Sequence, residues 1–310
     1  MPSSPTPLLT AGSTSAWARI PLGLKQMALG AFFFSIMSVC VKLASRHLPS
    51  SHTVLARGAV TLVMSWATLR KKKISPWGMD KKLLALRGFA GFVALNCYYY
   101  SLKHLPLADA TVIQYSSPIF TAILAALVLR ERMRPWEIFC VTVSFVGVFL
   151  VAQPPFLFHG QAAQNPTALL IAIAGSVTSS VAYVTVRKLR QTDDPAVIVF
   201  YFPLIAVPLS IAPMFRDRTM PTPFEWFLLL AIGVTTQMAQ VLMTKSLHSE
   251  PAGRATAVSY LQVAFAYGWG LFVFGEVPNG LSMLGALVVA VSILALAGRT
   301  LWAQVPAEPR

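Results

Sequence analysis

The sequence predicts an all-α membrane protein with ten transmembrane helices, arranged as two inverted repeats of five helices each. Three observations lead to this prediction: the composition, the spacing of the apolar segments, and a similarity between the two halves of the chain. Of the 310 residues, 55% are hydrophobic and only 12% are charged, whereas soluble domains carry about 25% charged residues. So little charge cannot cover a water-facing surface, and we therefore expect the chain to lie in a lipid bilayer.

The apolar residues occur in separate segments, each about 18–24 residues long and therefore able to cross roughly 30 Å of hydrocarbon. In lipid the backbone polar groups must be satisfied by a helix or by a closed barrel. The alternating ten-residue segments of a barrel are absent from the sequence. We therefore expect ten helical spans, at 26–45, 52–69, 84–103, 106–129, 135–152, 166–187, 195–214, 224–246, 252–274 and 280–301.

The segments between these spans carry the Pro, Gly and charged residues that are typical of turns. The segment PPFLFHGQAAQNP divides the chain into halves, and the first residues are rich in Ser, Thr and Pro, which is typical of disorder. The predicted organisation is a disordered cytoplasmic tail at 1–22, a first repeat at 23–152, an outer linker at 153–165, a second repeat at 166–301 and a cytoplasmic tail at 302–310.

The formal net charge is +14, from 25 Lys and Arg against 11 Asp and Glu. In a soluble domain this excess would suggest nucleic-acid binding, but basic residues also gather in the cytoplasmic loops of membrane proteins. With a cytoplasmic N-terminus, the ten spans place eighteen basic residues on the cytoplasmic side and five on the other. We therefore expect no nucleic-acid partner, and a multi-pass protein of a plasma or inner membrane with both termini in the cytoplasm.

The two halves resemble each other at an offset of 145 residues. Residues 106–131 and 251–276 align without a gap and are identical at seven of 26 positions, so that Thr111 and Tyr115 match Thr256 and Tyr260. A unit of five spans has an odd number of crossings, so the second copy enters the membrane upside down. Inverted repeats of this kind are frequent in transporters, whose two halves exchange conformations to alternate access.

Two stretches carry a family resemblance. ADATVIQYSSPIFTAILAALVLRERMRPWEIFCVTVSFVGVFLVAQP and RATAVSYLQVAFAYGWGLFVFGEVPNGLSMLGALVVAVSILALAG resemble the two halves of EamA-type permeases of the drug/metabolite transporter superfamily. The shared features are small residues at the start, an acidic residue at the helix end (Glu131, Glu276) and a glycine in the next helix (Gly147, Gly285). The resemblance covers residues 26–301 and implies an alternating-access carrier with a central cavity, in a superfamily whose members carry amino acids, nucleotide sugars, purines, carboxylates and other metabolites.

The sequence carries no HExxH, GxSxG or Walker motif, and Cys40, Cys97 and Cys140 have no paired spacing. We therefore expect no catalytic residues, no cofactor and no metal. Two alternatives to a transporter remain open: a membrane-embedded transferase-type enzyme, which would need clustered acidic or His residues, and a non-transporting receptor or scaffold. The predicted partners are a small-molecule metabolite and the bilayer, with a monomer and a homodimer both open.

Polar residues inside the spans are the candidate substrate ligands. Thr111 and Tyr115 share a helix face, as do their repeat mates, and they either line a cavity or join helices by hydrogen bonds. Uncharged amides in the eighth span must also face inward, and Asn96 shares a face with Tyr100. The candidate set is Arg57, Asn96, Tyr100, Thr111, Tyr115, Tyr183, Gln237, Gln240, Thr256 and Tyr260.

Arg57 is the most informative of these residues. It lies five or six residues into the second span, about 8 Å deep at 1.5 Å per residue, and a charge in the bilayer needs a partner or water. It either snorkels to the outer surface or balances an anionic substrate. The sequence therefore predicts a secondary transporter for a small polar or amphipathic metabolite, with an organic anion or an amino-acid-like solute as the candidate cargo.

Overall fold

The computed structural model describes residues 20–105, 107–131, 133–153, 166–216, 220–275 and 280–302, and the regular structure within these ranges is helical. Most of the predicted tails and of the predicted linker, together with Pro106 and Glu276, lie outside them. The helices are α2 (Leu22–Ala44), α3 (Ser50–Lys72), α4 (Lys81–His104), α5 (Leu107–Gln114), α6 (Ser117–Val128), α7 (Pro135–Ala152), α9 (Pro166–Leu189), α10 (Pro195–Arg216), α11 (Pro223–Ser249), α12 (Ala252–Val258), α13 (Leu261–Phe274) and α14 (Gly280–Trp302).

Among the described residues, six helical segments are long and apolar enough to cross a membrane: Leu22–Ala44, Ala110–Val128, Pro135–Ala152, Pro166–Leu189, Pro223–Ser249 and Ala252–Phe274. Shorter apolar stretches occupy Pro195–Ile211 in α10 and Gly280–Leu296 in α14. Helices α3 and α4 are less apolar because each carries a basic end and a buried arginine, Arg57 and Arg87. The chain is therefore a multi-pass helical membrane protein, and ten crossings remain a prediction.

Two of the predicted continuous spans, 106–129 and 252–274, are each interrupted. The breaks lie at residues 115–116, between α5 and α6, and at 259–260, between α12 and α13. At each break a serine side chain bonds the preceding turn: Ser116 Oγ donates to the Ile113 carbonyl and Ser259 Oγ to the Thr256 carbonyl, both at 2.6 Å. The backbone N–H groups of Ser116, Ser259 and Tyr260 bond three rather than four residues back, which tightens the helix locally.

Helix packing follows the repeat. Helix α2 packs on α11 and α9 packs on α4; α3 packs on α11 and α10 on α4; α2 packs on α13 and α9 on α6. The counterparts in the two halves are α2 and α9, α3 and α10, α4 and α11, α6 and α13, and α7 and α14. Replacing each helix by its counterpart converts the first contact of each of these three pairs of contacts into the second. The contacts α3–α10 and α7–α14 each join two counterparts and are therefore unchanged. These are the contacts expected of two repeats related by a twofold axis.

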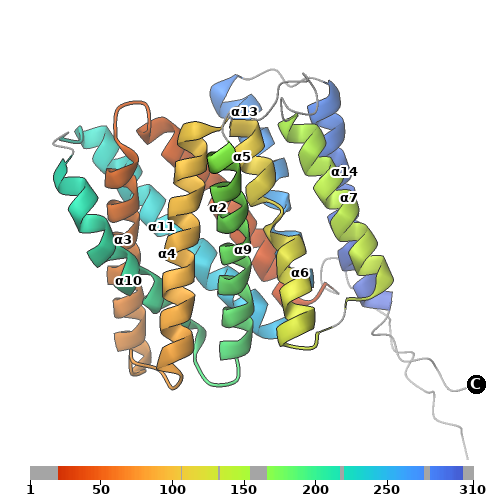
Figure 1. The fold of residues 1–310 in the computed structure, drawn as a ribbon, viewed down its shortest axis with the longest axis horizontal. Coiled ribbons are helices and arrows are strands. Elements are labelled where there is room, and N and C mark those ends of the chain that lie inside the picture. The colour runs from red at the N-terminus through yellow and green to blue at the C-terminus, as the bar shows by residue number, and fades with distance from the viewer. Residues whose placement is uncertain are drawn as a thin grey trace, which may run out of the picture.

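Helices α7 and α14 run side by side at one edge of the bundle (Figure 1). A Cβ atom added to Gly147 would lie 2.9 Å from the Gly285 carbonyl oxygen, and one added to Gly285 would lie 2.7 Å from the Gly147 carbonyl oxygen. The two backbones therefore touch, and the hydroxyls of Ser144 and Ser292 bond across the contact at 2.7 Å. Small residues commonly permit this close approach between helices in lipid.

The loops that follow α3, α6 and α9 lie at the same end of the bundle, and the junction between α4 and α5 lies at the opposite end (Figure 1). The loop after α3 holds Lys73, and the helices that flank these loops contribute the basic residues at 70–72, 81–82 and 187–188. One end of the molecule therefore collects much of the positive charge.

Candidate functional site

Two buried arginines meet at one aromatic ring inside the bundle. Arg57 projects from α3 and Arg87 from α4, and the ζ carbons of their guanidinium groups lie 5.8 Å and 5.7 Å from the centroid of the Phe202 ring in α10. Arg57 is only 7% exposed and Arg87 only 3%. Both side chains are therefore enclosed by the protein.

No carboxylate pairs with either guanidinium in the part of the chain that the structure describes. The ion pairs found there join Lys72 to Asp194, Arg187 to Glu131, and Arg254 to Glu137 and Glu250. A charge buried in a low-dielectric interior is costly unless it is paired. A cation–π contact returns about 0.5–2 kcal/mol, so the ring alone leaves both charges incompletely compensated, and this centre is strongly positive.

Local sequence features create the space for Arg87. A Cβ atom added to Gly91, one turn further along α4, would lie 2.7 Å from Arg87 Nη1 and 2.9 Å from Phe202 Cδ2. A Cβ atom added to Gly88 would lie 2.7 Å from the Tyr201 carbonyl oxygen. The two glycines therefore let α4 approach α10 closely and let the guanidinium lie against the ring. Arg87 Nη2 also donates to Gln240 Oε1 of α11 at 3.2 Å.

Residues that correspond in the two repeats meet at this centre. Arg57 and Phe202 are 145 residues apart, the offset of the repeat, and they are in contact. Tyr115 and Tyr260, another pair at this offset, have ring centroids 6.2 Å apart. Counterparts can touch only close to the axis that relates the halves, so both contacts mark the position of that axis.

A cluster of tyrosines adjoins the arginines. Tyr115 lies within electrostatic range of Tyr98, Tyr183 and Tyr260, and Tyr183 lies within such range of both Arg57 and Arg87. The Tyr260 side chain is fully buried, and its hydroxyl has no hydrogen-bond partner among the described residues. Tyr115 and Tyr260 each occupy a helix break. The tyrosine cluster therefore connects the breaks in two helices with the positive centre.

The remaining candidates are two threonines, the two amides of α11, and the pair Asn96 and Tyr100 of α4. Thr111 lies beside the cluster and hydrogen-bonds Tyr98, and Thr256 Oγ1 donates to the Ala252 carbonyl of its own helix at 2.8 Å. The two amides of α11 join helices, since Gln237 Nε2 donates to Ser65 Oγ of α3 at 2.8 Å and Gln240 accepts from Arg87.

Asn96 and Tyr100 are exposed, and their contacts stay within α4: Asn96 Nδ2 donates to the Phe92 carbonyl at 2.8 Å, and the Tyr100 ring lies 4.3 Å from that of His104. The residue of this helix that reaches the cluster is Tyr98. Sequence reasoning did not select Tyr98, Arg87 or Phe202. The repeat offset could have identified Phe202, since it places this ring opposite Arg57.

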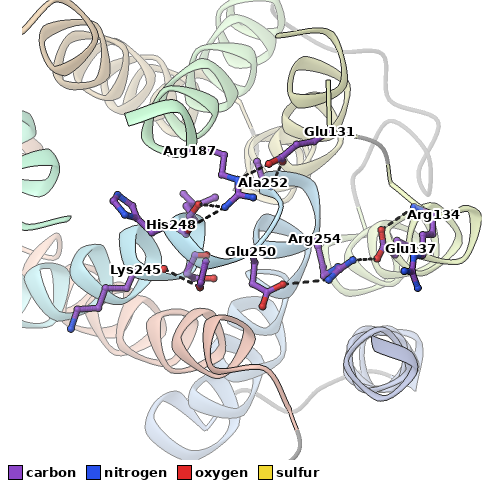
Figure 2. A network of polar contacts seen from close by, with 12 residues as sticks. Glu131, Arg134, Glu137, Arg187, Lys245, His248, Glu250, Ala252 and Arg254 are labelled. Atoms are coloured by element: carbon purple, nitrogen blue, oxygen red, sulfur yellow. Dashed lines mark hydrogen bonds and ion pairs between the residues drawn. The ribbon is translucent and has the colours of Figure 1, made fainter. Parts of the chain in front are cut away.

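A polar network joins several helices at the end of the bundle that carries the basic loops (Figure 2). Arg187 of α9 is 6% exposed; its Nε donates to Glu131 Oε1 at 2.6 Å and its Nη1 to the carbonyls of Leu247 and His248 at 3.1 Å and 2.9 Å. Glu131 Oε2 accepts from the Ala252 backbone N–H at 2.9 Å. These contacts tie the loop after α6 to α9 and to the junction of α11 with α12. We refer to Glu131 and Arg187 with their backbone partners as the latch.

Arg254 extends the connection from α12 to α7. In Figure 2 it lies between two carboxylates, those of Glu137 at the start of α7 and Glu250 at the end of α11. Glu137 Oε2 also accepts from the Arg134 backbone N–H at 2.9 Å. Burial raises the pKa of Glu250, outweighing the lowering by Arg254. Elements of both repeats are therefore joined by charge at this end.

Within the described ranges, no three His, Cys, Asp or Glu side chains are arranged to hold a metal ion. The polar chemistry of the interior is that of arginine, tyrosine, amide and hydroxyl groups. Such groups bind and orient a solute, and they carry no nucleophile or general base in an arrangement typical of catalysis.

Comparisons with known proteins also indicate a transporter. The model of the EamA-like transporter family matches residues 21–153 and 166–298. The pseudopaline exporter of Pseudomonas aeruginosa is 31% identical over 275 residues, covering 88% of this chain and 95% of the exporter. Human solute carrier family 35 member G1 is 30% identical over 283 residues, covering 87% and 77%. A solved crystal structure at 17% identity superposes with a TM-score of 0.77 over 90% of this chain and 96% of that chain, so the two share a fold.

Proposed function

Because the chain belongs to the EamA-like transporter family, we propose that it is a secondary transporter that moves a small organic anion across a membrane by alternating access. Both the family and the named relatives are transporters and not enzymes. The cargo and the manner of movement are our proposal, and the observations that support them concern the buried centre and the latch.

The observation that carries the choice of an anion is the burial of Arg57 without a carboxylate partner. A positive field in a low-dielectric interior concentrates anions, and a guanidinium grips a carboxylate with two parallel hydrogen bonds. An anionic solute would therefore compensate the charge that the Phe202 ring compensates only in part. In this proposal Arg57 binds the anion, while Tyr183, Tyr115 and Tyr260 line its path.

Alternating access requires that one end closes while the other opens. We assign the closed end to the latch, which lies where the loops are basic and hence, by the positive-inside rule, on the cytoplasmic side. The breaks at Tyr115 and Tyr260 are the points where α5–α6 and α12–α13 would bend. The name of the Pseudomonas relative, an exporter, supports movement out of the cytoplasm as the physiological direction.

The test is uptake into proteoliposomes that contain the purified full-length protein. Labelled organic acids, amino acids and amines are offered separately, and vesicle volume is reduced by raising external osmolality. We expect acids to accumulate in proportion to internal volume, and we expect Arg57→Gln to lower the initial rate at least tenfold. A signal that does not scale with volume would indicate a binding protein, and preferential uptake of amines would overturn the anion assignment.

A further inference from the structure

We propose that Arg57 and Arg87 together bind two anionic groups of one solute, so that the transporter prefers a doubly charged cargo over a singly charged one. This inference rests on the proposed function and adds a second substrate-binding residue, Arg87. It also names a class of cargo: small molecules that carry two carboxylates, or groups of equivalent charge, at separate positions.

The geometry places the two guanidinium groups within the length of one metabolite. The ζ carbons of Arg57 and Arg87 lie 5.8 Å and 5.7 Å from the centroid of the same ring, so they can be no further apart than 11.5 Å, the sum of these distances. The Phe202 ring contacts both guanidinium groups. An elongated solute could therefore place one carboxylate on each arginine while its carbon chain passes the ring.

Charge balance favours two negative groups over one. Arg57 and Arg87 are 7% and 3% exposed and have no carboxylate partner in the described part of the chain. A monoanion would neutralise one guanidinium and leave the other buried and unpaired, which is a costly arrangement in a low-dielectric interior. A dianion neutralises both.

Arg87 retains the donors that a second site needs. A guanidinium has five N–H donors. Among the described residues, the hydrogen bond given by Arg87 goes from Nη2 to Gln240, and its buried Nε has no partner. A purely structural arginine at 3% exposure would be expected to satisfy more of these groups. Gln240 then acts as a positioning residue that fixes the direction of the Arg87 side chain.

The test compares acids with esters that differ from them by one charge. Malonate, succinate, glutarate and adipate and their monomethyl esters are each titrated into the purified full-length protein, and affinities are obtained from the ligand-dependent rise in melting temperature. For the best-fitting chain length we expect the diacid to bind at least tenfold more tightly than its ester. Arg57→Gln and Arg87→Gln should each reduce that ratio to about one, since each removes one charged hydrogen-bonding partner.

Two further variants separate binding from structure. Gly91→Ala keeps both charges but places a methyl group against Arg87 Nη1 and Phe202, and we expect it to lose the preference for diacids as well. Lys72→Gln removes a positive charge from the exposed end of α3, and we expect its ratio to equal that of the parent. A lower melting temperature of unliganded Arg87→Gln with an unchanged ratio would make Arg87 structural and would overturn the inference.

The remaining outcomes distinguish this inference from the proposed function. If diacid and ester bind equally well, and Arg57→Gln weakens both, then the dianion inference fails while the anion transporter stands. If none of the four diacids binds, then the dianion inference fails; if amines are also taken up by the proteoliposomes in preference to acids, then the proposed function fails with it.

Discussion

Neutralising Glu131 should open the end of the bundle that the latch closes. Glu131 accepts from Arg187 Nε at 2.6 Å and from the Ala252 N–H at 2.9 Å. In Glu131→Gln the buried Arg187 retains its two carbonyl acceptors but loses its counter-charge. A hydrogen bond to a charged group contributes about 1.5–3 kcal/mol. Only the closed conformation, in which the latch is formed, gains this contribution. The population ratio of open to closed should therefore rise about 10- to 100-fold, at 1.4 kcal/mol per factor of ten.

The assay is a distance measurement between spin labels on the two repeats. Labels are placed at Arg134, at the start of α7, and at Lys245, near the end of α11; both are exposed. The three native cysteines, which are free thiols, are first replaced by alanine. We expect Glu131→Gln to add a longer distance component that is minor in the parent.

The matched control is Asp194→Asn, which neutralises one partner of the Lys72–Asp194 pair. These side chains are 45% and 32% exposed, and such surface pairs contribute little. Its distance distribution should equal that of the parent. Identical distributions for the parent and Glu131→Gln would show that the latch does not hold this end closed.

Three further predictions follow from the fold. Tyr115→Ala and Tyr260→Ala should each lower the rate of uptake into proteoliposomes about tenfold, the factor that a loss of about 1.4 kcal/mol gives, at near-normal membrane expression; parental uptake by both would remove the tyrosine cluster from the transport path. Gly147→Ala places a methyl group 2.9 Å from a carbonyl oxygen of α14 and should lower thermal stability by about 1–3 kcal/mol, whereas Gly268→Ala, with nothing within 4 Å of the added Cβ, should not; equal melting curves would show that the α7–α14 contact adapts. A cysteine at Gln161 should react with an impermeant thiol reagent from outside the cell, and reaction from the cytoplasmic side alone would reverse the topology.

Much of the helical layout could be predicted because long apolar segments have one stable form in lipid. The breaks at 115–116 and 259–260 could not. A serine within an apolar helix commonly bonds a carbonyl of the preceding turn without interrupting the helix, so Ser116 and Ser259 carry no signal that separates the two outcomes. The two breaks nevertheless share one equivalent pair of the repeat, Tyr115 and Tyr260, and an interruption known in one half would have predicted the other to within one residue.

The positive centre could be predicted only in part. Arg57 stands out because it follows a loop that the charge distribution predicts to be outside and lies several residues into its predicted span, whereas Arg87 follows Lys81 and Lys82 and resembles the basic end of a helix. What buries Arg87 is the space at Gly91 and the ring of Phe202 on another helix, which is information about tertiary packing. The sequence also does not predict which face of α4 points toward this centre, since tyrosines at 98, 99 and 100 cover most of the circumference of the helix.

The contact between Arg57 and Phe202 has a consequence for the ancestry of the protein. If both halves descend from a five-helix ancestor that paired with a second copy in the opposite orientation, then one residue type occupied both positions. Two arginines would have opposed like charges at the axis, and two phenylalanines would have supplied no charge at all. A mixed pair requires that the two copies mutate independently, which becomes possible once the ancestral gene is duplicated. On this view the asymmetry between Arg57 and Phe202 is younger than the duplication.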